Sequence, residues 1–170
     1  YPYDVVAIGS CCEEVFQYAS EQLAADKSFI LEAIKIDAFV LQHASEGLQA
    51  DREVVVAALE ENGATLEYAA ETLRSDRTVV LAAVEKNGHA LKYAAETLKN
   101  DRTVVLAAVR QNGGALEYAP KDLRADQEVV LTAVRQNGDA LEHASKGLRN
   151  DVNIRIQAWR SENEAAILLL

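Results

Sequence analysis

The sequence predicts an all-α fold, an α-solenoid of stacked two-helix repeats with a period of 25 residues. Three observations predict it: the same residues recur every 25 positions, each unit has two stretches with helical apolar spacing, and a helix-capping aspartate opens each unit. One such hairpin cannot bury its own apolar faces, whereas stacked copies can. At ~8–10 Å per helix layer, six units would form a rod roughly 50–60 Å long.

An aspartate column defines the period. It consists of Asp26, Asp51, Asp76, Asp101, Asp126 and Asp151. An alanine column that includes Ala69 and a leucine column that includes Leu73 repeat with the same spacing. An aspartate oxygen can accept from the free N–H groups of a first helical turn, so we expect these residues to be structural helix caps.

The first helix of a unit is exemplified by residues 51–61, DREVVVAALEE. Its apolar side chains share one face: Val54, Val55, Ala58 and Leu59. Asn62 and Gly63 follow, and we expect this pair to end the helix with a residue of positive φ.

The second helix is expected at residues 64–73. Its apolar positions are spaced i, i+3, i+4, i+7: Leu66, Ala69, Ala70 and Leu73. Only Arg74 and Ser75 separate it from the next cap. So short a connection makes sequential helices antiparallel neighbours.

The whole chain, residues 1–170, is expected to form a single solenoid domain. Residues 1–25 read as a degenerate N-terminal repeat, 26–150 as five regular repeats, and 151–170 as a degenerate C-terminal repeat or cap. Terminal repeats are atypical because one of their faces meets water. The apolar tail 167–170 would pack on the preceding helix, continue into a further segment, or meet another protein.

The charge and composition of the chain limit the classes of partner that we expect. The net charge of −10 disfavours nucleic acid, which needs a basic surface, and permits a basic partner. No run approaches 18 apolar residues, so no membrane span is expected, although a partner could itself be a membrane complex.

Cys11 and Cys12 are adjacent and read as reduced thiols, which points to a reducing intracellular compartment, with an organelle among the alternatives. The absent initiator methionine fits processing after import, excision from a longer repeat protein, or an incomplete sequence.

Catalytic, metal-binding and cofactor-binding motifs are not found in the sequence. His43 and His143 stand four repeats apart, too far to share a metal ion, and His89 stands alone. The repeated Asn-Gly reads as a helix stop and not as a phosphate-binding loop. We therefore expect no enzyme and no cofactor.

One aromatic column has two interpretations. It comprises Tyr18, His43, Tyr68, Tyr93, Tyr118 and His143. The rings could pack into the grooves between successive second helices, or they could form a ladder that faces a partner. Charged positions on the second helix would then carry specificity: Glu67, Glu71, Lys92, Glu96, Glu117 and Lys121. Three i,i+4 pairs on this helix indicate solvated faces: Lys92–Glu96, Glu117–Lys121 and Glu142–Lys146.

The repeat has a distinctive pattern, D-R-x-V-V-L-A-A-V-x-x-N-G-x-A-L-x-Y, seen in residues 76–93 and 101–118. It resembles the tandem-repeat family catalogued as domain of unknown function 4116, over about residues 19–151. A weaker similarity is to leucine-rich-variant repeats, but their Asp-Pro and Asn-Pro turns are missing here. The resemblance implies a helical repeat fold and no biochemical role.

Two functions remain open. The first is a non-catalytic protein–protein interaction scaffold that binds a partner, of unspecified identity, through its stacked-helix surface. The alternative is a permanently bound structural or accessory subunit of a larger assembly, such as an organellar membrane complex of photosynthesis or respiration.

Overall fold

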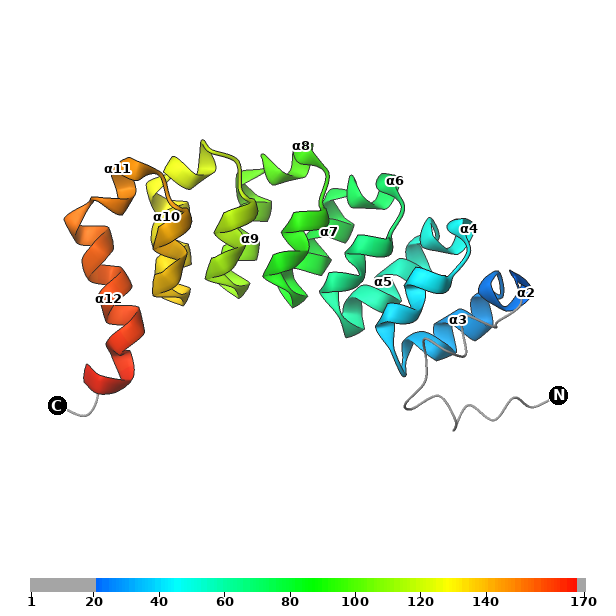
Figure 1. Ribbon diagram of the computed structural model, residues 1–170. Helices are drawn as coiled ribbons and strands as arrows, with labels where there is room; N and C mark the ends of the chain where they lie inside the picture. Colours follow the sequence, from blue (N-terminus) through cyan, green and yellow to red (C-terminus); the bar gives the residue numbers. More distant parts are fainter. Residues whose placement is uncertain (1–20, 168–170) are drawn as a thin grey trace.

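The computed structural model describes the backbone of residues 21–167 and the side chains of residues 21–161 and 163. In this part of the chain every regular element is a helix, and the helices stack in sequence order into an arc (Figure 1). This confirms the predicted all-α solenoid of 25-residue units. Tyr18, Cys11, Cys12 and the tail 168–170 lie outside the described residues.

Each unit begins with an α-helix that crosses the array. These helices are α3 (Lys27–Ile34), α5 (Arg52–Glu61), α7 (Arg77–Lys86), α9 (Arg102–Gln111), α10 (Gln127–Gln136) and α12 (Val152–Ile167). Their fully buried side chains repeat in register, as in α9: Val104, Val105, Ala108 and Val109. Each of these long helices contacts the next one along the chain. The core is therefore continuous from unit to unit, as stacked repeats require.

The segment expected as the second helix is divided in two. A 3₁₀-helix comes first: η2 (Ala38–His43), η3 (Gly63–Tyr68), η4 (Gly88–Tyr93), η5 (Gly113–Tyr118) and η7 (Gly138–His143). One short α-helical turn follows in most units: α2 (Glu21–Ala24), α4 (Glu46–Gln49), α6 (Glu71–Arg74), α8 (Glu96–Lys99) and α11 (Lys146–Arg149).

A hydrogen bond between units explains this division. Ala69 and Ala70 have extended backbones, with ψ near 150°. The N–H of Ala70 donates to the carbonyl oxygen of Gln49 in the preceding unit, at 2.9 Å. A donor used across the unit boundary cannot also continue a helix. The same bond recurs at Ala95, Ser45 and Ser145.

Pro120 interrupts this series of bonds. It occupies the place of Ala70 and Ala95 but has no N–H group to donate. The short α-helix is missing in this unit, where a turn leads into the 3₁₀-helix η6 (Leu123–Ala125).

The Asn-Gly pairs differ from the expectation. The first helix does end at Asn62, as expected, but no described residue has a positive φ, so the expected left-handed conformation is wrong. Asn62 is extended, at φ −151° and ψ 112°, and its Oδ1 accepts from the N–H of Ala64 at 2.9 Å. It therefore caps the 3₁₀-helix that follows. Gly63 is needed for space, because a Cβ there would collide with the Ala83 carbonyl oxygen of the next unit.

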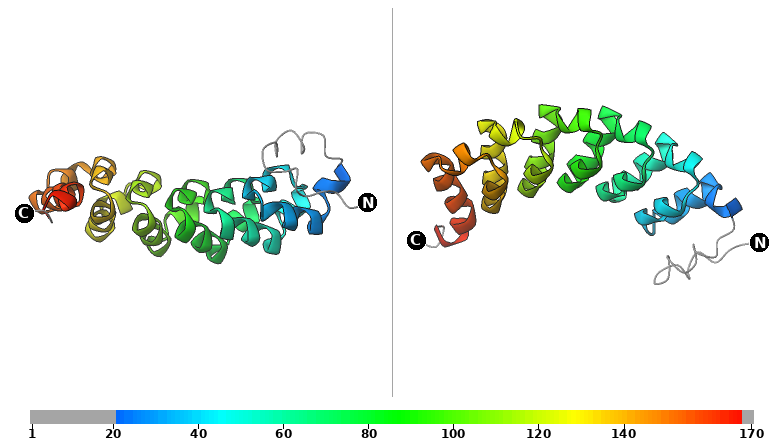
Figure 2. Two further views of the ribbon diagram at one scale, coloured as in Figure 1. Left: turned by 90° about the horizontal axis from the view of Figure 1, so that it is seen from below. Right: turned by 45° about the horizontal axis from the view of Figure 1, so that its top comes forward.

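The arc presents distinct surfaces. The short helices α4, α6, α8 and α11 lie along its outer edge, and the long helices run from there toward the inner edge (Figure 1). Seen from below, the helices form two rows (Figure 2). Contacts between successive 3₁₀-helices and between successive long helices place one kind of helix in each row.

Candidate functional site

The aromatic column lies along the row of 3₁₀-helices. Its five described members are half-buried: His43, Tyr68, Tyr93, Tyr118 and His143. The three tyrosines pack against the core. Some of these rings also meet a ring of the preceding unit edge to face: Phe39 with Tyr68 at 6.2 Å between centroids, and His89 with Tyr118 at 5.7 Å. The column therefore contributes to the contact between units, while part of each ring stays accessible.

The tyrosine hydroxyls meet charged side chains. Burial raises the pKa of Tyr93, and a hydrogen bond to the Glu67 carboxylate of the preceding unit raises it further. Burial is also the main reason that the pKa of Tyr118 is raised, with the neighbouring Glu117 charge adding to it. The Lys92 ammonium lies 5.3 Å from the centre of the Tyr93 ring. These hydroxyls are therefore neutral hydrogen-bond donors at physiological pH.

The charged positions predicted to carry specificity are all exposed: Glu67, Glu71, Lys92, Glu96, Glu117 and Lys121. All six members of the predicted i,i+4 pairs are exposed, as expected of solvated faces, but none of these pairs forms an ion pair among the described residues. Two extended residues separate their members, so positions i and i+4 do not share a helix face. Ion pairs instead form within the short helices, from Glu71 to Arg74 and from Glu96 to Lys99, both at 2.8 Å.

The aspartate column accepts hydrogen bonds at the start of the long helices. In each case Oδ1 accepts one or two backbone N–H groups of the first turn: Asp26, Asp51, Asp76, Asp101, Asp126 and Asp151. Four of these carboxylates also accept, through Oδ2, from a cation of the preceding unit. The pairs are Lys27–Asp51, Arg52–Asp76, Arg77–Asp101 and Arg102–Asp126, at 2.6–2.9 Å.

This ladder of ion pairs affects the aspartate pKa values. The Arg77 guanidinium is the main cause of the lowered pKa of Asp101, and Lys27 and Arg102 act alike on their aspartates. For Asp76 the Thr78 hydroxyl lowers the pKa most. Gln127 takes the cation's place in the next unit, so the ladder ends there.

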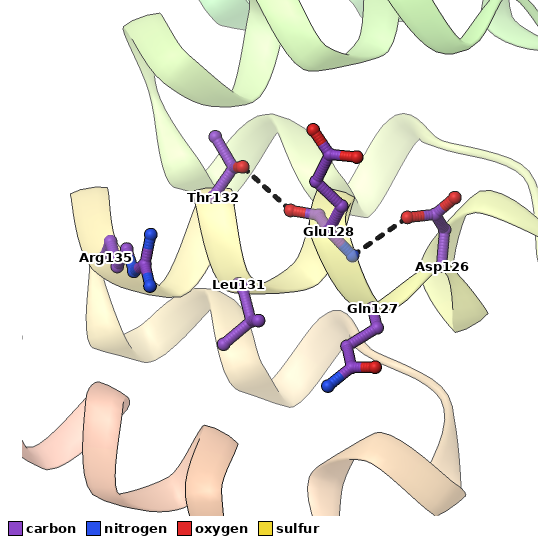
Figure 3. A pocket seen from close by; sticks show the side chains of 6 residues that line it. All are labelled: Asp126, Gln127, Glu128, Leu131, Thr132 and Arg135. Carbon is purple, nitrogen blue, oxygen red and sulfur yellow. Dashed lines mark hydrogen bonds between the residues drawn. The ribbon is translucent and has the colours of Figure 1, made fainter.

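A polar hollow of about 480 Å³ runs along α10 (Figure 3). Its lining is Asp126, Gln127, Glu128, Leu131, Thr132 and Arg135. Glu128 and Thr132 lie on one side of α10, and Gln127 and Leu131 on the other (Figure 3). The Thr132 hydroxyl donates to the Glu128 carbonyl at 2.7 Å, and the Glu128 N–H donates to Asp126. Both hydrogen bonds lie within α10 and its N-terminal cap.

Two further hollows lie toward the C-terminal end. One, of about 280 Å³, is lined by α12 residues: Val152, Arg155, Ile156 and Trp159. The other, the basic pocket, has about 320 Å³ and is lined by Lys121, Arg124, His143, Ala144, Ser145, Lys146 and Arg149. The sequence analysis selected Lys121 and His143 as candidate partner contacts but not Arg124, Lys146 or Arg149. A change from glutamate to lysine at the position of Glu71 and Glu96 was the available signal.

Metal ligands and membrane spans were also sought in the described part of the chain. No group of three or more His, Cys, Asp or Glu side chains there could hold a metal ion. None of the helices described is both long enough and apolar enough to cross a membrane.

Comparison with known proteins places the chain in a family. No curated protein and no solved structure matches it. A family model described as domain of unknown function matches it repeatedly, at residues 7–49, 26–74, 51–99, 76–124 and 126–158. From residue 26 on, successive matches begin one or two 25-residue units apart, as expected of a tandem array. Because these matches cover most of its length, the chain belongs to the domain of unknown function family DUF4116.

Proposed function

We propose that this chain is a non-catalytic scaffold that binds a partner protein through the row of 3₁₀-helices and the short helices beside it. One observation carries the proposal. The paired core valines and the aspartate caps are the same in the units that begin at Asp51, Asp76, Asp101 and Asp126, whereas exposed side chains on this surface change.

The constant part includes the core, the caps and the bonds between units. Val104 and Val105 of α9 are matched by Val129 and Val130 of α10, all fully buried. The cap at Asp101 and its ion pair recur in neighbouring units. A framework of this kind keeps its shape whatever the exposed residues are.

The variable part lies beside the tyrosines. One exposed position reads Glu67, Lys92, Glu117 and Glu142 in successive units, and another position reads Ala64, His89, Gly114 and Asp139. Partly accessible tyrosines amid changing charges resemble the composition of binding surfaces, where tyrosine is favoured at hot spots. A pattern of charges along this row would select a partner by complementary charge.

Matched charge reversals test this surface. The affinity-tagged chain is incubated with source extract, and specifically captured partners are identified by mass spectrometry. The test variant reverses three charges on the 3₁₀-helices: Glu67→Lys, Lys92→Glu and Glu117→Lys. A control with the same change in net charge reverses three exposed positions of the long helices: Glu60→Lys, Glu85→Lys and Arg110→Glu. We expect the test variant to lose its partner and the control to keep it. Equal retention by both would contradict the proposal.

A second candidate is a permanently bound subunit of a larger assembly, such as an organellar membrane complex. The exposed apolar side chains of α12 favour it: Val152, Ile156 and Trp159 are 67, 43 and 58% exposed. The equivalents of Ile156 and Trp159 in α9 are Leu106 and Val109, which are 8 and 0% exposed. Native size fractionation separates the two functions. Co-migration with a large complex after salt washes supports the subunit, and migration near 18.5 kDa supports the scaffold.

A further inference from the structure

The basic pocket arises from a change of sign at one position of the repeat. In α6 and α8 the first residue is a glutamate, Glu71 or Glu96, which neutralises the cation three residues later. In the next two units this position holds Lys121 and Lys146. The cations three residues later remain, as Arg124 and Arg149. An internal ion pair has therefore become a pair of like charges, twice in succession.

These four cations are left without carboxylate partners. Among the described residues, no ion pair involves Lys121, Arg124, Lys146 or Arg149. Arg124 is half-buried, and its buried Nε has no hydrogen-bond acceptor. The equivalent Nε of Arg74 also lacks one, but there the guanidinium is neutralised by Glu71. An unpaired, partly buried guanidinium group is costly, so an anion beside Arg124 would be stabilised.

The pocket brings the cations of two units together. It lies between the turn after Pro120 and α11, with His143 and Ser145 between them. No carboxylate lines it. Among the carboxylates near in sequence, Asp122 is exposed, Asp126 pairs with Arg102, and Glu142 lies 3.3 Å from His143 Nε2. The Ser145 N–H already donates to the Arg124 carbonyl oxygen, so it is not free to bind an anion.

The chemistry of this lining selects an oxyanion. Two guanidinium groups can each donate two parallel hydrogen bonds, and two ammonium groups add point charges. A carboxylate brings one negative charge, whereas a phosphate monoester brings −1.5 to −2 and three acceptor oxygens. The volume of about 320 Å³ also leaves room for the residue that carries the group. We propose that the basic pocket binds a phosphorylated side chain of the partner protein, an inference that rests on the proposed scaffold function.

A nucleic acid fits the surroundings less well. Its charges continue along the backbone, so it needs a basic surface longer than one pocket. Residues 26–100 carry 13 acidic and 8 basic side chains, and residues 101–150 carry seven of each. Four of the seven basic side chains of residues 101–150 line the pocket, and neither stretch carries a net positive charge.

The test uses the whole chain and a defined probe. Calorimetry measures binding of a pentapeptide with a central phosphoserine between alanines, its unphosphorylated form, inorganic phosphate and a single-stranded oligonucleotide. The variant Lys121→Glu, Lys146→Glu restores the glutamates of α6 and α8, so it should fold. The control variant Arg110→Glu, Arg135→Glu changes the net charge equally, at exposed sites of the same two units.

We expect saturable phosphopeptide binding that weakens by roughly 10- to 100-fold in the Lys→Glu variant and by under about 3-fold in the control. The unphosphorylated peptide should bind at least about 10-fold more weakly. The proposal is overturned if no saturable binding occurs, if both variants lose binding equally, if inorganic phosphate binds as tightly as the peptide, or if the oligonucleotide binds more tightly through the same lysines.

Capture from source extract separates this inference from the scaffold function. If the Lys→Glu variant retains the captured partner unchanged, the scaffold stands and the phosphate-dependent docking is refuted. Loss of the partner from this variant, and after phosphatase treatment of the extract, supports the inference. If no variant captures a partner while the phosphopeptide still binds at the lysines, the scaffold function fails and the phosphate site remains.

Discussion

Replacing Asp101 tests how the units are joined, because its carboxylate performs two tasks. Oδ1 accepts from the N–H groups of Thr103 at 2.8 Å and Val104 at 3.4 Å, which caps α9. Oδ2 accepts from Arg77 Nε at 2.8 Å, which ties α9 to α7 of the preceding unit. The side chains of Arg77 and Asp101 are 49 and 26% exposed, so we expect this ion pair to contribute about 0.2–1 kcal/mol, as is typical of exposed pairs.

Two substitutions separate these tasks. Asp101→Ala removes both, and we expect a loss of about 1–2 kcal/mol in the free energy of unfolding: about 1 from the cap and 0.2–1 from the ion pair. Asp101→Asn keeps the capping oxygen and loses only the charge, so about 0.2–1 kcal/mol should be lost. Arg77→Ala should cost about as much as Asp101→Asn and should add little to Asp101→Ala.

Urea denaturation followed by circular dichroism measures these differences at pH 7. At about 1 M salt the difference between Asp101→Asn and the unchanged chain should shrink, whereas the capping difference should remain. Asp139→Ala is the control, because this aspartate is exposed and caps no helix, and its effect should stay within about 0.5 kcal/mol. The reasoning is refuted if Asp101→Asn costs as much as Asp101→Ala, or if Asp101→Ala matches the control.

Three more predictions concern packing and pH. Gly88→Ala should lower the free energy of unfolding by at least about 2 kcal/mol, since its Cβ would collide with the Ala108 carbonyl oxygen. The control Gly47→Ala lies in open space and should not destabilise the chain, and equal effects of the two substitutions would contradict this account. Tyr93→Ala should lower the free energy of unfolding by about 2–3 kcal/mol and Tyr93→Phe by under about 1 kcal/mol, because the ring packs on the core. Normal stability of Tyr93→Ala together with lost binding would instead make the ring a contact with the partner. The cap carboxyls Asp51, Asp76, Asp101 and Asp126 have lower pKa values in the folded than in the unfolded chain, so their stabilisation is present above the unfolded value, about 3.9, and is lost as pH falls through the folded value. Urea midpoints that stay constant from pH 6 to pH 2.5 would contradict this expectation.

The sequence determined the architecture because the signals for it are local and repeated. The spacing of Val104, Val105, Ala108 and Val109 marks a helix face, and those side chains are fully buried. The aspartates stand at helix starts, where an acceptor side chain and free N–H groups are adjacent in sequence. A 25-residue period without insertions then leaves little choice but stacking.

The tertiary structure alone decided why the predicted second helix is divided and why glycine is needed. Ala70 has a good helical propensity, yet its N–H bonds to Gln49 of another unit, and this divides the predicted second helix. Gly63 looked like a helix stop, but it is set by the approach of Ala83 from the following unit. Both causes act between units, and helix propensity within one unit contains no information about them.

The candidate sites likewise combine features that the sequence shows with features that depend on the tertiary structure. The tyrosine column could be found by alignment of the repeats, but its half-burial and its contacts with the preceding unit depend on how the units stack. The basic pocket combines Lys121 and Arg124 of one unit with Lys146 and Arg149 of the next. Sequence alone shows a glutamate replaced by lysine twice. Only the stacking of two units brings four uncompensated cations around one space, because a pocket is a property of distances between units and not of residue order.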